Sequence, residues 1–336
     1  LIPLSLYIFL PSSSSFSSPS YSLPQSPCPF LYSLISSSMD SKEFDLSSSL
    51  SSHRWWSKNT VAIVTGANKG IGFALVRKLA QSELTVVLTA RDEVRGLKAV
   101  ETLRNEGLGH VLFRRLDVSD PDSIVAFAAW FASNFQALDI LVNNAAVSFN
   151  DIYENSVENA ETVMKTNFYG PKLLIEALFP YFRSSSSKTR ILNITSRLGT
   201  VDKVRNIKVK EILESEDVSE EDIEGVVNAF LEDVKTGTWK KAGWPALWTE
   251  YAVSKLALNT YTRVLAKRYG AYGSVSVNSF CPGFTQTSMT GGKGTHTADA
   301  AALVGCRLAL LPSHRLPTGQ FFFWGPNYTI PRKSKL

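Results

Sequence analysis

The chain has 336 residues, of which 44% are hydrophobic and 19% are charged, a balance typical of a globular protein with a large core. Its formal net charge is +5, but the basic residues are scattered and form no stripe with interleaved aromatic side chains, which argues against nucleic-acid binding. Three cysteines, Cys28, Cys281 and Cys306, lack metal-ligand spacing, so we expect buried, reduced thiols and no metal site.

The first 38 residues differ in composition from the rest, because they are rich in Ser, Pro, Leu and Phe and contain no Lys, Arg, Asp or Glu. A secretory signal needs a basic start, and a mitochondrial or chloroplast transit peptide needs arginines. The apolar run LIPLSLYIFL is too short to span a bilayer. We expect residues 1–58 to be a disordered extension, with 1–38 as candidate upstream sequence and Met39 as candidate start. No other segment is apolar enough for a membrane helix, so we expect no membrane partner.

From Thr60 onward, short β-branched runs alternate with longer amphipathic stretches. The strand candidates are VAIVTG, TVVLTA, VLFRRLD, DILVNNA, TRILNITS, SVSVNSFCP and QFFFWG. This alternation predicts an α/β fold, a doubly wound Rossmann-type parallel sheet of about seven strands with helices on both faces. We expect one such domain over residues 59–326, with ligands at the carboxyl ends of the strands, and an exposed tail over 327–336.

One segment, about 200–245, interrupts the alternation. Residues 214–224 carry seven acidic side chains and no basic one. Apolar residues then recur at the spacing of an amphipathic helix: Ile223, Val226, Val227, Phe230, Leu231 and Val234. Ser219 is the expected N-cap, and acids in the first turn suit the helix dipole. We therefore predict an inserted helical element before Tyr251.

The apolar face of this insert must be buried, and we expect it to pack near the helix that begins at Tyr251. The acidic stretch 214–224 then faces solvent and discourages self-association. On one hypothesis the C-terminal end of the insert, at Trp244, also forms a wall of an apolar substrate pocket. On the alternative hypothesis the insert covers a surface and never touches substrate.

The segment TGANKGIG, residues 65–72, follows the first strand and opens the first helix. Gly66, Gly70 and Gly72 allow a tight turn and a close approach of the backbone to a pyrophosphate, which the helix N-terminus would stabilise. A glycine-rich turn alone also suits a plain strand-to-helix connection. Its place at the first strand–helix junction favours the dinucleotide interpretation.

The second strand ends in LTARDE, where a dinucleotide site selects its cofactor. Arg91 at this end and Lys69 in the glycine loop place two cations near the ribose, which favours a 2′-phosphate and hence NADPH over NADH. On the alternative interpretation Arg91 is solvated and Asp92 accepts from a 2′-hydroxyl.

The segment YAVSK places Tyr251 and Lys255 one helical turn apart, on the same face of a helix. A tyrosine with an ordinary pKa of about 10 is a poor proton donor at neutral pH. A neighbouring ammonium group favours the phenolate and lowers that pKa, which would make a general acid. The alternative is a chance pair on a solvated surface.

The motifs TGANKGIG, LDV, NNAA, TNFYG, NITS, YAVSK and CPGF, in this order and spacing, resemble the short-chain dehydrogenase/reductase family from Thr60 to about Gly325. The spacing from Ser196 to Tyr251 (251 − 196 = 55) and the insert resemble its monomeric carbonyl-reductase branch, with plant menthone, neomenthol and salutaridine reductases.

This resemblance implies a role for each matching residue. Tyr251 would protonate the carbonyl oxygen, and Lys255 would bind the nicotinamide ribose and lower the pKa of the tyrosine. Ser196 would hold the substrate oxygen, and Asn167 would anchor a water in a proton relay. The implied cofactor contacts are Gly66, Asn68, Lys69, Gly70, Ile71, Gly72, Arg91, Asp117, Val118, Asn144, Tyr251, Lys255, Pro282, Gly283 and Thr287.

Two departures from the family pattern concern the site. Ala146 stands where the family has glycine, which we expect to narrow the active-site floor without abolishing catalysis. The stretch TQTSMTGGKGTHT after CPGF suggests a mobile loop over the substrate. We expect His296 in this loop to be an ordinary exposed residue; a catalytic role is the alternative.

We therefore expect an NADPH-dependent carbonyl reductase or alcohol dehydrogenase whose partner is a hydrophobic ketone or aldehyde, such as a terpenoid or another secondary metabolite. The alternatives are a broad-specificity detoxifying reductase and a non-catalytic NADPH-binding regulatory protein. The insert predicts a monomer. The resemblance favours the cytoplasm, whereas the C-terminal tripeptide Ser334-Lys335-Leu336 reads as a peroxisomal address.

Overall fold

The computed structural model describes residues 54–149, 155–183, 188–270 and 273–324. The expectations for Cys28, for the start of the chain up to residue 53 and for the tail 327–336 with its C-terminal tripeptide lie outside these residues. The predicted disorder of residues 1–58 is wrong at its end, because Trp56 is buried in the core and its Nε1 donates to the carbonyl of Ser82 at 3.0 Å.

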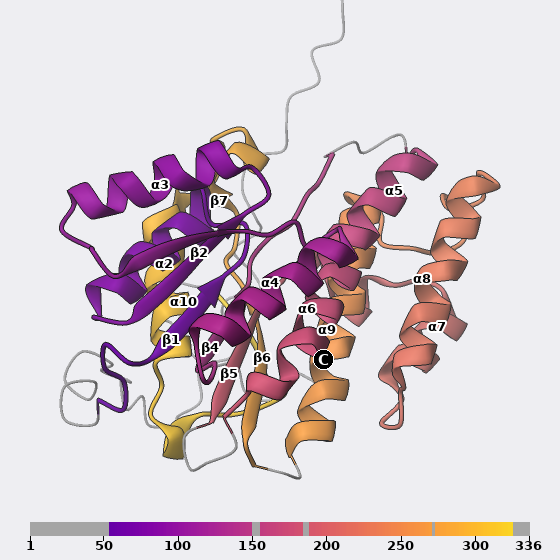
Figure 1. Ribbon diagram of the computed structural model, residues 1–336. Coiled ribbons are helices and arrows are strands. Elements are labelled where there is room, and N and C mark those ends of the chain that lie inside the picture. Colours follow the sequence, from indigo (N-terminus) through magenta and orange to yellow (C-terminus); the bar gives the residue numbers. More distant parts are fainter. Residues whose placement is uncertain (1–53, 150–154, 184–187, 271–272, 325–336) are drawn as a thin grey trace, which may run out of the picture. The chain divides into compact units, whose positions relative to one another are not determined.

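Seven parallel strands form the central sheet, in the order β3-β2-β1-β4-β5-β6-β9 (Figure 1). The strands are β1 Val61–Val64, β2 Thr85–Ala90, β3 Val111–Arg115, β4 Ile140–Asn143, β5 Thr189–Ile194, β6 Val275–Cys281 and β9 Phe321–Phe323. Each lies within one of the seven runs predicted from the sequence. Every residue of β1, β4, β5 and β6 is buried, because a parallel sheet is covered on both faces. β1 and β4 are almost wholly apolar, whereas β5 and β6 also bury polar side chains such as Asn193 and Asn278.

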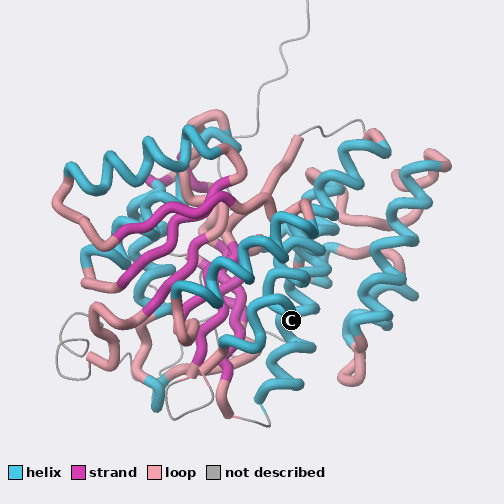
Figure 2. The backbone as a smooth tube through the Cα atoms, in the orientation of Figure 1, coloured by secondary structure: helices cyan, strands magenta, loops and turns pink. Residues whose placement is uncertain are grey.

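Helices cover both faces of the sheet, as Figure 2 shows. One hydrophobic core lies under α2 Gly70–Gln81, α3 Glu93–Asn105 and α10 Ala298–Ala309. The other lies under α4 Pro121–Asn134, α5 Val157–Met164, α6 Gly170–Leu178 and α9 Thr249–Gly270. The predicted doubly wound Rossmann-type fold is therefore confirmed.

The insert forms two helices, α7 Ile207–Glu214 and α8 Glu220–Lys235. Ser219 is the N-cap of α8, and its side chain and that of Asp222 form a reciprocal capping box, as the N-cap prediction requires. The predicted apolar face of α8 is buried, with Leu231 partly buried, and α8 packs against α9 and α5 (Figure 1). Most side chains of α9 are consequently buried, since the sheet lies on one side of it and the insert on another.

The prediction that the whole acidic stretch 214–224 faces solvent is wrong at Glu220. The side chain of Glu220 is only 13% exposed and forms ion pairs with Lys172 of α6 at 3.1 Å and with Arg268 of α9 at 2.6 Å. Glu224 also pairs with Lys172, at 3.4 Å. Glu220 and Glu224 thus attach α8 to α6 and α9 through ion pairs with Lys172 and Arg268.

Shorter elements connect these layers. A π-helix spans Lys165–Tyr169, and 3₁₀ turns span Phe179–Tyr181, Arg197–Gly199, Val201–Lys203, Ser288–Thr290 and Ser313–Arg315. Two short parallel strands, β7 Thr285–Gln286 and β8 His296–Thr297, pair with each other. In the part of the chain that the structure describes, no helix is both long and apolar enough to cross a membrane. The same residues contain no group of three or more His, Cys, Asp or Glu side chains that could hold a metal ion.

Candidate active site

A large cavity of about 1130 Å³ lies at the carboxyl ends of the strands. Strands β2 and β3 are added on one side of β1, and β4, β5 and β6 on the other, so the strand order switches at the β1–β4 pair. Open parallel sheets bind their ligands at this switch point. Residues that follow six different strands line the cavity: Gly66, Arg91, Asp117, Asn144, Ser196 and Pro282. Parallel pairing alone brings these positions to one edge of the sheet, although they span more than 200 residues of sequence.

The glycine loop is packed against the end of β4. Gly66 has φ +60, and a Cβ there would lie 2.7 Å from the Cα of Ala145. A Cβ on Gly72 would lie 2.4 Å from Nδ2 of Asn144, which donates hydrogen bonds to the carbonyls of Thr65 and Gly66 at 2.9 and 3.1 Å. Gly66, Asn68, Lys69, Gly70 and Ile71 line the cavity, whereas Gly72 does not and instead permits this close packing.

Helix α2 begins at Gly70 without side-chain capping. Its N-cap, Lys69, makes no side-chain capping bond, and the first turn holds no acidic residue. The N–H groups of this turn therefore remain available to an anion, which the positive end of the helix dipole stabilises. This matches the dinucleotide interpretation of the loop.

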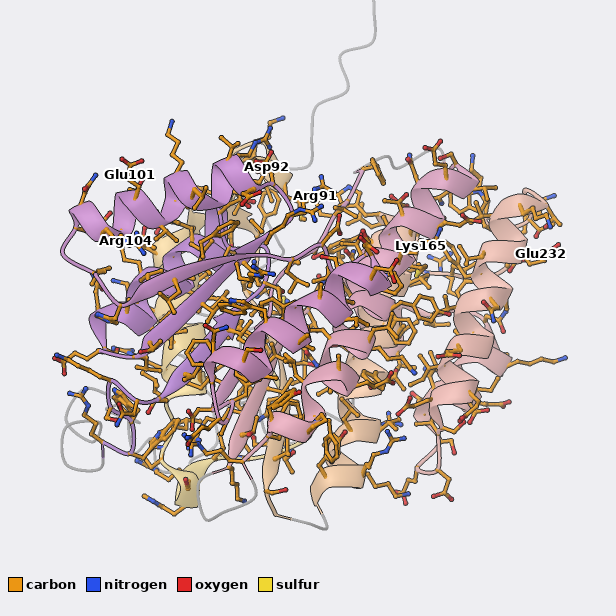
Figure 3. All side chains as sticks on the ribbon, viewed as in Figure 1. Arg91, Asp92, Glu101, Arg104, Lys165 and Glu232 are labelled. Atoms are coloured by element: carbon orange, nitrogen blue, oxygen red, sulfur yellow. The ribbon has the colours of Figure 1, made fainter. Side chains whose placement is uncertain are left out.

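Arg91 and Asp92 lie next to each other where α3 begins (Figure 3). Arg91 lines the cavity, as does Lys69. The carboxylate of Asp92 does not line it, because it caps α3 by accepting from the backbone N–H of Arg95 at 2.9 Å and pairs with the Arg95 side chain at 3.3 Å. The alternative in which Asp92 serves a 2′-hydroxyl is therefore disfavoured.

Tyr251, Lys255 and Ser196 all line the cavity. Tyr251 and Lys255 lie at the start of α9, with Nζ of Lys255 5.6 Å from the centre of the Tyr251 ring. Lys255 is buried and donates a hydrogen bond to the carbonyl of Ile194 at 2.9 Å. The structure thus brings the phenol, the ammonium and the hydroxyl to one cavity. The spacing predicted the pairing of Tyr251 and Lys255, and the family resemblance implied the place of Ser196.

Two further residues fix Ser196 against α9, and the sequence reasoning did not select either. A Cβ on Gly199 would lie 2.4 Å from the backbone N of Leu256, so the turn after Ser196 touches the helix directly. Asn259 donates from Nδ2 to the carbonyl of Gly199 at 2.9 Å and to that of Ser196 at 3.4 Å. Asn259 was recognisable, since it lies eight residues after Tyr251 and therefore on the same helical face.

Burial dominates the electrostatics of Tyr251 and Lys255. Removal from water lowers the pKa of Lys255 from 10.5 to about 7 and raises the pKa of Tyr251 above its ordinary value. In the protein alone, desolvation is the main cause that holds the pKa of Tyr251 above its ordinary value. The lowering of this pKa by Lys255 stays a prediction for the cofactor-bound protein.

Asn167 lies in the π-helix, is fully buried and does not line the cavity. Its side chain accepts from the N–H of Val147 at 2.9 Å and donates to the carbonyl of Val147 at 2.9 Å and to Oγ of Ser254 at 3.0 Å. The amide thus connects the loop after β4 to α9. The other expected contacts, Val118, Gly283 and Thr287, line the cavity, as does Ala146.

The expectation of an exposed His296 is wrong. The imidazole is 8% exposed and lies parallel to the indole of Trp324, with ring centres 3.6 Å apart. Its Nε2 lies 2.8 Å from the carbonyl of Pro282 and 3.1 Å from Oγ1 of Thr285. His296 is buried by a tertiary contact, because Trp324, which follows β9, covers a loop whose polar sequence suggests exposure to solvent.

The hypothesis that Trp244 faces the pocket is also wrong. Trp244 is buried in the insert, where its ring packs edge-on against Phe230 and its Nε1 donates to Asp233 at 2.8 Å. Other residues of the insert line the cavity instead, Thr200, Val201, Asp202, Lys203 and Glu214, together with Leu247 and Trp248, which follow it. The alternative in which the insert never reaches the pocket is therefore disfavoured. Cys281 and Cys306 are free and buried, as predicted.

The model of the short chain dehydrogenase family matches residues 60–207 and 241–298. The chain belongs to this family. Residues 208–240, between the two matched ranges, contain most of α7 and all of α8. As a short-chain dehydrogenase/reductase, the protein is an oxidoreductase that acts on hydroxyl and carbonyl groups.

The match to this chain covers nearly the whole length of several relatives. A (+)-neomenthol dehydrogenase of Arabidopsis thaliana is 42% identical over 284 residues, 78% of this chain and 95% of the relative. Carbonyl reductase (NADPH) 1 of Bos taurus is 37% identical over 273 residues, 79% of this chain and 96% of the relative. The solved structure of salutaridine reductase from Papaver somniferum superposes with a TM-score of 0.72 at 37% identity, covering 79% of this chain and 99% of that one.

Proposed function

We propose that this oxidoreductase is an NADPH-dependent carbonyl reductase that reduces a hydrophobic ketone or aldehyde, such as a terpenoid or another secondary metabolite. One observation carries the proposal: the wall with Tyr251, Lys255 and Ser196 and the cations Lys69 and Arg91 line the same cavity. The relatives named neomenthol dehydrogenase, salutaridine reductase and carbonyl reductase support the reaction class.

The residues of the cavity fit a dinucleotide. The glycine loop leaves no room for a Cβ at Gly66, and the uncapped start of α2 offers N–H groups to the pyrophosphate. Asp117 and Val118 would contact the adenine, and Pro282, Gly283 and Thr287 would hold the nicotinamide end. Lys69 and Arg91 would bind a 2′-phosphate, which makes NADPH the preferred cofactor over NADH.

The bound reduced nicotinamide supplies a hydride to the carbonyl carbon. Tyr251 donates a proton to the carbonyl oxygen in the same reduction, and the hydroxyl of Ser196 donates a hydrogen bond that orients this oxygen. Lys255, with a pKa of about 7, exchanges protons readily near neutral pH and so can return a proton toward Tyr251. Asn167 positions α9 through Ser254 and supports the relay.

The substrate end of the cavity is largely apolar, with Val147, Leu198, Val201, Leu247, Trp248, Phe284 and Met289 in its lining. Burial of apolar surface gives about 25 cal/mol per Å², so such walls favour hydrophobic carbonyl compounds. We further propose that the protein is a monomer, because α8 covers the surface of α9 that would otherwise be free to pair with a second copy.

The test follows cofactor oxidation with a panel of terpenoid ketones, aromatic ketones and small aldehydes, each with NADPH and NADH. Selective turnover of terpenoid ketones with NADPH supports the proposal. Similar rates across the panel would favour a broad detoxifying reductase, and tight NADPH binding without turnover would favour a regulatory protein. Light scattering that gives a stable oligomer would contradict the monomer.

We propose that the protein resides in the cytoplasm or in peroxisomes. A fluorescent protein fused to the N-terminus leaves the C-terminal tripeptide free to be recognised. Punctate fluorescence that disperses when Ser334, Lys335 and Leu336 are deleted assigns peroxisomes; a uniform signal from the full-length fusion assigns the cytoplasm.

A further inference from the structure

Trp248 has a backbone conformation that bulky residues seldom adopt. Its φ is +48, and among the described residues only Glu83 shares a positive φ without being glycine. In this region the Cβ of an L-residue crowds its own backbone, so a large side chain persists there only where the surrounding structure enforces it. Such strained positions concentrate at functional sites.

The chain is anchored on both sides of Trp248. Upstream, Trp244 is fixed in the insert by Asp233 and by the ring of Phe230. Downstream, the carbonyl of Trp248 accepts from the N–H of Ala252 at 2.8 Å and so begins α9. Only three residues separate the two tryptophans. The segment is therefore too short to relax the conformation without displacing either α8 or the catalytic helix.

The strained residue lies beside the reacting groups. Trp248 lines the cavity three residues before Tyr251, next to the partly exposed Leu247. Phe284 and Met289, which also line the substrate end, belong to the glycine-containing segment after β6. Trp248 lies at the junction between the insert and α9, and its carbonyl accepts from Ala252, so its backbone is fixed directly to the helix that carries Tyr251 and Lys255.

We propose that Trp248 determines substrate specificity, its indole forming a flat wall that selects planar cyclic carbonyl compounds over flexible linear ones. This inference rests on the proposed carbonyl-reductase function. A large rigid aromatic face gains most from a flat ring stacked upon it, and a linear chain must lose conformational freedom to lie along it. Because its backbone is anchored at both ends, the wall is in place before substrate binds.

The experiment compares three ketones of equal carbon number: α-tetralone, which is planar, trans-decalone, which has the same ring skeleton but is saturated, and methyl octyl ketone, which is linear. The expected order of kcat/KM for the wild type is α-tetralone, then trans-decalone, then methyl octyl ketone. Trp248→Ala and Trp248→Gly should each lower the ratio of α-tetralone to methyl octyl ketone by about tenfold. Trp248→Phe should retain most of it.

The melting temperatures of the same variants test the strain. Trp248→Gly and Trp248→Ala both remove the indole, but only glycine adopts φ +48 freely. The glycine variant should therefore melt above the alanine variant. Trp244→Phe is the matched control, since it weakens the insert and lowers the melting temperature but should leave the ketone ratio unchanged.

Two results separate this inference from the proposal beneath it. If the wild type reduces none of the ketones with NADPH, the carbonyl-reductase proposal fails and the inference falls with it. If the wild type reduces them but the ratio is unchanged in Trp248→Gly and Trp248→Ala, only the role of Trp248 is overturned. A shift of equal size in Trp244→Phe would likewise overturn it, by assigning the effect to the fold of the insert.

Discussion

The imidazole of His296 and the indole of Trp324 lie parallel, 7° apart, with ring centres separated by 3.6 Å. Through its Nε2, His296 also reaches the carbonyl of Pro282. A carbonyl oxygen only accepts hydrogen bonds, so Nε2 carries the hydrogen and donates it. His296 thus connects Pro282, at the start of the segment after β6, to its own position in β8, and it packs on Trp324, which follows β9.

This contact predicts that His296 positions the cofactor loop. His296→Phe keeps a ring on Trp324 but leaves the carbonyl of Pro282 without this donor, whereas His296→Gln keeps a side-chain N–H. The carbonyl of Pro282 keeps Oγ1 of Thr285 as a donor, at 3.0 Å, so His296→Phe loses one net hydrogen bond, which costs about 0.5–1.5 kcal/mol. We expect His296→Phe to raise the KM for NADPH by about tenfold with little change in kcat, and His296→Gln to restore part of the loss. A lower melting temperature with an unchanged KM would contradict a positioning role.

Tyr251→Phe should remove most turnover and leave NADPH binding nearly unchanged. The phenol acts in the transition state, and a positioned general acid contributes about 10²–10⁴-fold. Tyr261→Phe is the matched control on the same helix, because the Tyr261 hydroxyl is buried and has no hydrogen-bond partner among the described residues. Steady-state kcat and a binding titration check both variants. If Tyr251→Phe keeps more than about a tenth of wild-type kcat, Tyr251 is not the general acid.

Replacement of both Lys69 and Arg91 with Ala should raise the KM for NADPH strongly and leave the use of NADH little changed. Hydrogen bonds to charged groups contribute roughly 1.5–3 kcal/mol each, and only NADPH carries the 2′-phosphate that these cations would bind. Arg95→Ala is the control, because Arg95 is exposed, pairs with Asp92 and does not line the cavity. Equal losses with both cofactors would show that the two cations do not recognise the 2′-phosphate.

Lys255→Met should stabilise the cofactor-free protein most below about pH 7. The pKa of Lys255 is about 7 in the folded protein and 10.5 when unperturbed, so the unfolded state binds more protons between these values. Below pH 7 the buried ammonium is charged and its full desolvation cost, on the order of a few kcal/mol, opposes folding. This cost shrinks as pH rises and vanishes near pH 10.5, and so should the gain from Lys255→Met.

Denaturant unfolding at several pH values measures this trend. The exposed Lys98→Met on α3 provides the control for removal of one positive charge. A gain from Lys255→Met that stays constant from pH 6 to pH 10, or that grows with pH, would contradict a lowered pKa for Lys255.

Local patterns predicted most of the fold, because each strand is a short β-branched run and the insert helix repeats apolar residues at helical spacing. Ser219 was recognisable as an N-cap from its side chain and the acids that follow. The motifs also selected Tyr251, Lys255 and Ser196, which the structure brings to one cavity.

The errors concern contacts made at long range. His296 is buried by Trp324, which lies 28 residues further along the chain (324 − 296 = 28), and Glu220 meets cations from two other helices. No periodicity within the loop or the insert encodes those partners. Burial is likewise beyond local spacing, since the separation of Tyr251 and Lys255 reveals a neighbouring charge but not the desolvation of both groups.

Helix α8, which packs on α9, belongs to the same chain as α9. A segment tethered in this way has an effective concentration set by the length of its linkers, and the amount of protein in solution does not alter it. Dilution, which separates subunits, therefore leaves the buried surface of α9 unchanged. The face of α9 that α8 covers therefore has the same surroundings in a concentrated stock and in a trace assay.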